Sequence, residues 1–170
     1  MNKSQKTQAV LLLFVGLAAF AILAARFPGK FDWSEGNLYT LSETTRELVS
    51  EIEEPIEFTF YFTRSHEDVP IGLKNFGSWI EDLLERYAEI SDGRISVRVI
   101  DPEPDTEEED AALRLGFPRR SFPDGTNLFF GLAVTSADVT EIIPFFQPDR
   151  ESFLEYDISQ LIQRVQQFEK

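Results

Sequence analysis

The chain has 170 residues, no cysteine, a single histidine and a formal net charge of −14 at pH 7. The lack of cysteine excludes disulfides, thiolate catalysis and cysteine-ligated zinc, and a single histidine excludes a multi-histidine metal site. A chain this acidic lacks the basic clusters that bind phosphate backbones, so we expect no nucleic-acid partner.

An apolar segment near the N-terminus, residues 9–25, carries no charged side chain. A helix over residues 7–27 would be about 30 Å long, which is enough to cross the hydrocarbon core of a bilayer. A cleaved secretory signal is the alternative, but it needs a shorter apolar core followed by a small-residue cleavage site. We therefore predict a cytoplasmic segment (1–6), an uncleaved transmembrane helix (7–27) and a linker (28–40).

The basic residues around this segment predict its orientation. Lys3, Lys6 and the α-amino group precede it, whereas Arg26 and Lys30 follow it. This slight excess on the N-terminal side favours a cytoplasmic N-terminus by the positive-inside rule. All 30 acidic residues lie after position 30, so residues 41–170 should form an acidic, extracytoplasmic domain that stays off anionic headgroups.

Residues 41–170 alternate between helical and extended patterns. Ser42 is a predicted N-cap for a first helix that ends before Pro55. Residues 56–63 alternate with the period of a strand, and a sustained apolar stripe predicts a long helix over 71–91. The remaining elements follow in chain order: a strand at 94–100, a short helix capped by Asp105 or Thr106 that ends at Gly116, a loop over 117–126, strands at 128–134 and 139–146, and a helix from about residue 150.

This order predicts an α/β fold with a four-stranded mixed sheet. The long helix is an ample crossover, so the first two strands should be parallel, whereas the last two form a hairpin. The apolar third strand belongs in the middle beside the first, and Pro144 moves the fourth strand to an edge. We therefore expect a three-layer domain with strand order 2-1-3-4 and a thioredoxin-like topology without the redox site; a small Rossmann-like sheet is the alternative.

Candidate binding residues lie in the loops that follow the first two strands. Arg64 and His66 follow the first strand, and Asp101, Glu103 and Asp105 follow the second. Because the carboxyl ends of parallel strands meet at one edge of a sheet, these loops should converge there. A lone histidine in such a polar loop is usually solvated.

Two further features are candidate sites. Arg119 and Arg120 could hold an anion or a partner's carboxylate, although a solvated pair is more common. The carboxylates that run from Asp101 into Glu107–Asp110 are of the type that binds Ca²⁺, but they lack the glycine of an EF-hand loop, and acidic residues at a helix start are expected from the helix dipole. No phosphate-binding loop, nucleophile elbow or zinc motif occurs. We predict no catalytic residue, no cofactor and no metal.

Several segments occur in a fixed order after the apolar N-terminus: FDWSEGNLYTLS (31–42), EPIEFTFYF (54–62), VIDPEP (99–104), IPFF (143–146) and FLEYDI (153–158). Together they resemble the gliding-motility-associated ABC-transporter auxiliary (GldG-like) proteins, over nearly the whole chain. The resemblance implies a bacterial inner-membrane protein with a periplasmic domain that works beside an ABC permease and a cytoplasmic ATPase. Relatives are longer, with a second large domain, and the resemblance carries over no catalytic residue.

The main functional hypothesis is a membrane-anchored, non-catalytic accessory component of an ABC-type transport or gliding-motility system. Its partners would be the permease, the ATPase and, through the N-terminal helix, the lipid bilayer. The alternative is a periplasmic ligand-binding module with its site at the loops after the first two strands. A third hypothesis, an enzyme that uses the carboxylates there, lacks any recognisable constellation of catalytic groups.

Overall fold

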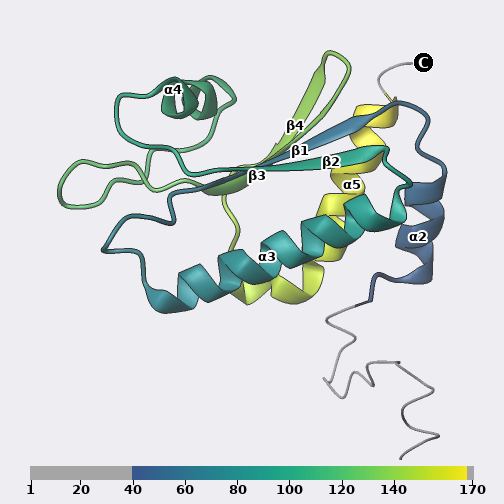
Figure 1. Ribbon diagram of the computed structural model, residues 1–170, viewed down its shortest axis with the longest axis horizontal. Helices are drawn as coiled ribbons and strands as arrows, with labels where there is room; N and C mark the ends of the chain where they lie inside the picture. Colours follow the sequence, from purple (N-terminus) through teal and green to yellow (C-terminus); the bar gives the residue numbers. More distant parts are fainter. Residues whose placement is uncertain (1–39, 168–170) are drawn as a thin grey trace, which may run out of the picture. The chain divides into compact units, whose positions relative to one another are not determined.

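The computed structural model describes residues 40–167 (Figure 1). The elements are α2 (Glu43–Ser50), β1 (Ile56–Phe62), α3 (Ile71–Ile90), β2 (Ile95–Ile100), α4 (Glu107–Arg114), β3 (Phe130–Ser136), β4 (Val139–Ile143), the 3-10 helix η1 (Pro148–Phe153) and α5 (Leu154–Gln167). The predicted cytoplasmic segment, transmembrane helix and all but the last residue of the predicted linker lie outside the described residues. Within residues 40–167, no helix is both long enough and apolar enough to cross a membrane.

The four strands form one mixed sheet with the order β2-β1-β3-β4, which confirms the predicted order. β1 and β2 are parallel, with α3 as the crossover between them. β3 is antiparallel to both β1 and β4. Phe58 of β1 lies opposite Val97 of β2 and Val134 of β3, so the most apolar strands occupy the centre of the sheet and β2 and β4 form its edges.

The last two strands differ from their predicted bounds. β4 ends at Ile143 instead of Phe146, because Pro144 has no N–H for the ladder. β3 begins two residues later than predicted, at Phe130. Just before it, the Thr63 hydroxyl accepts a hydrogen bond from the Phe129 N–H (3.0 Å), so a side chain replaces a backbone partner where the regular ladder stops.

The helix starts follow ordinary capping chemistry. The Ser42 hydroxyl accepts from the Thr45 N–H at 3.2 Å, as expected for the N-cap of α2. For α4 the structure selects Thr106 over Asp105 as the cap, because the Thr106 hydroxyl accepts from the Glu109 N–H at 3.4 Å. Asp105 lies one residue earlier, with a φ of 61° in the left-handed region.

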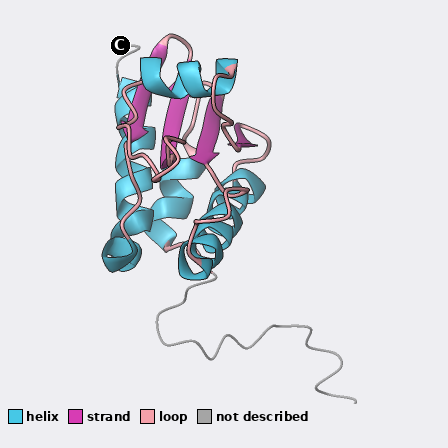
Figure 2. Cartoon of the chain, turned by 90° about the vertical axis from the view of Figure 1, so that its left-hand side faces the viewer, coloured by secondary structure: helices cyan, strands magenta, loops and turns pink. Residues whose placement is uncertain are grey.

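Helices cover both faces of the sheet (Figures 1 and 2). The face toward α2, α3 and α5 holds the main core, which includes Phe58, Phe60 and Phe62 of β1 and the apolar stripes of the three helices. α4 lies on the opposite face, over a small cluster formed by Tyr61, Ala112, Phe117, Phe129 and Ala133. The sheet therefore has one thickly covered face and one thinly covered face.

Candidate functional site

The loops that follow β1 and β2 meet at the carboxyl ends of the two strands. The Ser65 N–H donates to the Asp101 carboxylate (N to Oδ2, 3.1 Å), and the Ser65 hydroxyl donates to the same oxygen. One oxygen of Asp101 is therefore engaged in joining the two loops, and this carboxylate has a structural role.

His66 is bound into the same region. It is not solvated, contrary to the prediction from the sequence. Its side chain is only 12% exposed, and its ring stacks on Phe122 with the ring centroids 4.0 Å apart. Nδ1 accepts from the Asp68 N–H (3.2 Å), so the proton of the neutral ring lies on Nε2, which is 2.9 Å from the Asp124 carboxylate. Hydrogen bonds from His66 and from the Thr126 N–H hold the pKa of the Asp124 carboxyl below its usual value.

The three arginines among the predicted site residues have separate environments. Arg64 forms an ion pair with Glu81 of α3. The Arg120 guanidinium lies over the Phe145 ring, 3.9 Å from its centroid, which is close enough for a cation–π interaction. Arg119 is exposed and forms no ion pair or hydrogen bond with another residue of the 40–167 range. The two adjacent arginines therefore do not act together on one group.

The acidic run around α4 is also partly structural. The Glu109 carboxylate accepts from the Asp105 N–H (2.9 Å) and from the Asn127 amide (2.7 Å), so it caps α4 and joins it to the loop before β3. Glu103 and Glu108 are exposed. Within residues 40–167, the carboxylates and His66 form no group of three or more that could hold a metal ion.

A groove of about 480 Å³ runs beside β2 where this strand ends. It is lined by Arg98, Val99, Ile100, Asp101, Glu103, Thr106 and Glu108. Two of the predicted site residues, Asp101 and Glu103, therefore contribute to one surface. Arg64, His66, Asp105, Arg119 and Arg120 do not line this groove.

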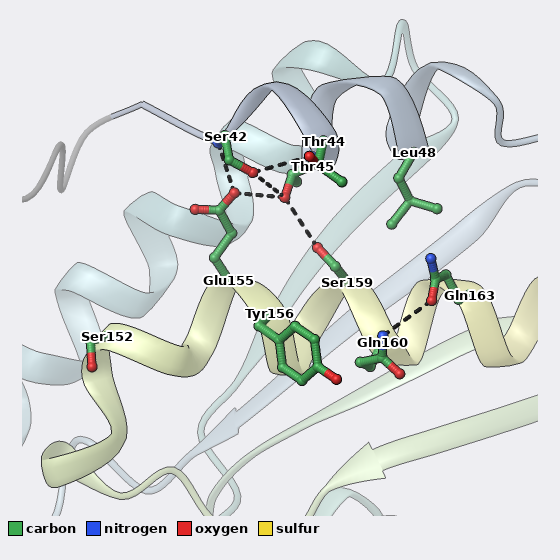
Figure 3. A pocket seen from close by; sticks show the side chains of 10 residues that line it. All are labelled: Ser42, Thr44, Thr45, Leu48, Ser152, Glu155, Tyr156, Ser159, Gln160 and Gln163. Atoms are coloured by element: carbon green, nitrogen blue, oxygen red, sulfur yellow. Dashed lines mark hydrogen bonds between the residues drawn. The ribbon is translucent and has the colours of Figure 1, made fainter.

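A second cleft, of about 350 Å³, lies between α2 and α5 and was not predicted from the sequence (Figure 3). Its lining is Ser42, Thr44, Thr45, Leu48, Ser152, Glu155, Tyr156, Ser159, Gln160 and Gln163. Glu155 accepts hydrogen bonds through Oε1 from the Ser42 N–H (2.7 Å) and the Thr45 hydroxyl (2.6 Å), which hold the two helices together. A smaller cleft of about 200 Å³ continues from Leu48 and Gln163 toward the end of α5.

Sequence reasoning missed this cleft because no motif marks it. The sequence predicts a helix from about residue 150, and the polar residues along it match no binding motif. One signal was available: residues 158–167, ISQLIQRVQQ, contain a single charged side chain in a strongly acidic chain. Only the packing of α2 against α5 turns these residues into a cleft.

Comparison with known proteins places the chain in a family of undefined function. No curated protein and no solved structure matches the chain. A family model described as a domain of unknown function, DUF7088, matches residues 35–135, from before α2 to the end of β3. The match spans more than half of the 170 residues, and the chain belongs to the DUF7088 family.

Proposed function

We propose that this chain is a membrane-anchored, non-catalytic accessory component of an ABC-type transport or gliding-motility system, and that its α/β domain docks partner proteins. The uncharged apolar segment 9–25 supports the anchor. The resemblance to GldG-like auxiliary proteins supports the choice of system, with an ABC permease and its ATPase as partners. It also supports an extracytoplasmic place for the domain at a bacterial inner membrane.

The observation that carries the docking role is the composition of the α2–α5 cleft. In a chain with a net charge of −14, Glu155 is the one carboxylate among the residues that line it. The rest of the lining consists of hydroxyl, amide and apolar side chains, with Tyr156 64% exposed. The cores of protein interfaces are depleted in charged residues and enriched in tyrosine. The lining of this cleft therefore shares two features with the core of a protein interface, which are a low content of charged side chains and an exposed tyrosine.

The same cleft is well suited to binding because its walls are fixed. Glu155, Ser42 and Thr45 are hydrogen-bonded to one another across the two helices, and the Thr45 and Ser159 hydroxyls lie 3.4 Å apart (Figure 3). A surface held in place before binding loses little conformational freedom when a partner docks. Glu155 itself is used in this framework, which leaves Tyr156 and the glutamines to meet a partner.

We infer a thioredoxin-like relation for the fold from the order of elements. From β1 onward the chain runs β-α-β-α-β-β-α, with strand order 2-1-3-4 and an antiparallel β3. A Rossmann-like sheet is mostly parallel, so the two antiparallel pairings favour the thioredoxin-like alternative. Without any cysteine, the chain could share with thioredoxins only the scaffold and not the thiol chemistry.

The docking proposal is tested by co-purification of the full chain with its permease and ATPase from membranes. We expect the double variant Tyr156→Ala/Gln160→Ala to capture at least ten times less of both proteins than the wild type. Phe153→Ala is the matched control, because Phe153 is an exposed aromatic residue (54%) on the neighbouring turn of η1 that does not line the cleft. Equal capture by the wild type and the double variant would refute docking through this cleft, and no capture by any form would refute the choice of system.

The ligand-binding alternative keeps one supporting observation, which is that the loops after β1 and β2 meet through Ser65 and Asp101. A small ligand bound there would raise the melting temperature of the full chain, and the rise would grow with the logarithm of the ligand concentration above its Kd. A screen of periplasmic solutes that gives no such rise would count against this role.

A further inference from the structure

β2 presents an open backbone edge. It is the outer strand of the sheet and pairs only with β1 among the described strands. The Arg94 carbonyl accepts from the Ile56 N–H (2.8 Å), which fixes the even-numbered residues of β2 as those whose backbone groups point to β1. The N–H and C=O groups of Val97 and Val99 therefore point away from the sheet.

The beginning of this edge is closed and its end is open. The Ile95 N–H, on the same outer side, donates to the Ser91 hydroxyl at 2.9 Å, so a side chain of the preceding turn occupies that position. Further along, Val99 is 39% exposed. An unpaired strand edge with an exposed apolar side chain is a template for an added strand.

The open end of the edge leads into the groove beside β2. The charged side chains that line this groove differ in whether they form ion pairs. Arg98 is already paired with Glu57, with 2.6 Å between the charged groups. Glu103 and Glu108 line the groove, and neither forms an ion pair with any residue in the described range. A segment lying along β2 would therefore pass two unpaired carboxylates where the strand ends.

We propose that the free edge of β2 binds an extended segment of a partner protein, which adds a fifth strand to the sheet and places lysine or arginine side chains against Glu103 and Glu108. The inference rests on the proposed function, because it supplies a second contact for a docking domain. Backbone hydrogen bonds to Val97 and Val99 would give the affinity, and the two carboxylates would select the charge of the segment.

Charge complementarity favours such a basic segment over a second copy of this chain. Pairing β2 with the β2 of another copy would bring two acidic grooves and two strongly negative domains together. Like charges opposed in this way are destabilising. Self-association through β2 is therefore the competing outcome that the experiment must distinguish.

The test measures binding of three fluorescent nine-residue peptides to the full chain in detergent micelles, by anisotropy. Each peptide consists mainly of alternating valine and threonine. Its remaining residues are chosen so that the three peptides have net charges of +3, 0 and −3. We expect the +3 peptide to bind at least tenfold more tightly than the neutral peptide, and the −3 peptide to bind most weakly. Equal affinities for the +3 and −3 peptides would overturn the assignment of a basic partner.

The backbone part of the inference is tested with proline. Val99→Pro removes an outward N–H without removing a ladder hydrogen bond to β1, and it should weaken binding of the +3 peptide at least tenfold. The matched control is Thr140→Pro on the opposite edge, where the pairing of Val134 with Glu141 makes the Thr140 N–H point outward. Unchanged peptide binding by a folded Val99→Pro variant would overturn the inference.

A charge variant keeps the test decisive if Val99→Pro fails to fold. Glu103→Gln/Glu108→Gln should reduce the affinity for the +3 peptide about tenfold and leave that for the neutral peptide unchanged. The control is Glu85→Gln/Glu89→Gln, two exposed carboxylates of α3. If the +3 peptide binds Glu103→Gln/Glu108→Gln as tightly as it binds Glu85→Gln/Glu89→Gln, the acidic groove is not its site.

Two further outcomes separate this inference from others. A dimer that forms with rising concentration and is lost in Val99→Pro would mean that the edge binds a second copy, which overturns the proposed partner. If Val99→Pro still captures the permease and ATPase but no longer binds the +3 peptide, the edge inference stands independently of the α2–α5 cleft. If the wild type captures neither protein, the proposed function fails while the peptide measurements still decide the edge.

Discussion

On the α3 side of the sheet, β1 contributes Phe58, Phe60 and Phe62, each buried among side chains from several elements. On the α4 side, the same strand contributes Glu57, Thr59 and Tyr61, and of these only Tyr61 belongs to an apolar cluster. The Thr59 hydroxyl donates to the Glu57 carboxylate (3.0 Å), and Glu57 pairs with Arg98. One strand thus joins an aromatic core to a mixed face, on which Thr59 and Tyr61 are buried and Glu57 is exposed.

The difference indicates that stability and binding are assigned to different parts of the domain. The α3 side buries α3 and α5 against the sheet, with α2 packed on these two helices, so it supplies most of the apolar burial that drives folding. The α4 side is held by one short helix and by hydrogen bonds between loops, and it leaves the β2 edge and its groove accessible. Changes of exposed residues at the β2 edge and its groove should therefore alter binding more than folding.

The substitutions with the largest expected effect on stability replace one phenylalanine on each side of the sheet. The Phe60 ring lies 5.7–5.8 Å from the rings of Phe62, Phe130 and Phe146, measured between centroids, and is fully buried. Phe60→Ala should lower the free energy of unfolding by about 3–5 kcal/mol, because the cavity cannot collapse among so many fixed neighbours. Denaturant unfolding followed by fluorescence measures this change.

The matched substitution on the thin side is Phe117→Ala. Phe117 packs mainly on Tyr61 (5.0 Å between centroids) and lies at the end of α4, where a loop can close over the space. Its loss should cost about 2 kcal/mol, below the usual range for a buried phenylalanine. Equal losses for the two variants would contradict the view that the α3 side dominates stability.

Much of the fold was predictable because local patterns and burial agree. The alternation of residues 56–62 predicted β1, and the 3-4 spacing of Phe76, Ile80, Leu83 and Tyr87 predicted α3. Pro144 predicted an edge strand, because a missing N–H has the same consequence in any sheet. These features depend on residues close together in the chain, so the sequence alone contains them.

The sites were harder to predict because they depend on contacts between distant segments. His66 is hydrogen-bonded to Asp124, which lies 58 positions away in the chain, and no local sequence pattern predicts that pairing. The α2–α5 cleft likewise joins Thr45 to Glu155 across 110 positions. Convergence of the loops after β1 and β2 was expected, because it follows from parallel topology, but the structural use of Asp101 was not.

A second test concerns the two glycines that let other atoms approach the sheet closely. In Gly131→Ala, the new Cβ of this β3 residue would lie 2.5 Å from the Ile143 carbonyl oxygen and 2.9 Å from that of Pro144. Backbone atoms cannot move away easily, so this substitution should destabilise the protein by about 2–3 kcal/mol. Thermal unfolding would register it as a clear fall in melting temperature.

The matched change on the thick side is Gly77→Ala in α3, where the new Cβ would overlap the Phe62 ring. The methyl group must displace this buried ring, which also packs on Phe60 and Phe130. Alanine favours a helix over glycine by about 1 kcal/mol, which offsets part of that cost. The net loss should therefore be only about 1 kcal/mol. A larger loss for Gly77→Ala than for Gly131→Ala would show that the packing of α3, and not the backbone next to β3, is the tighter constraint.

The smallest effect is expected from single hydroxyl groups, one on each side of the sheet. Tyr87 of α3 donates to the Glu155 carbonyl (2.9 Å) and lies 3.0 Å from the Ser159 hydroxyl. Tyr87→Phe should cost about 1 kcal/mol at neutral pH, the usual net value of one buried hydrogen bond. Denaturant unfolding at pH 7 measures this difference.

Alkaline pH separates the two sides further, because burial raises the pKa of Tyr87 well above its usual value. Between the unfolded pKa of about 10 and the folded value, the unfolded chain releases the phenolic proton while the folded protein keeps it. The wild type should therefore lose stability as the pH rises above about 10, and Tyr87→Phe should lose less. Burial also raises the pKa of Tyr61, but Arg98 opposes that shift on the thin side. Tyr61→Phe should change the alkaline slope less than Tyr87→Phe does, and the reverse order would mean that the α4 side excludes water as well as the α3 side.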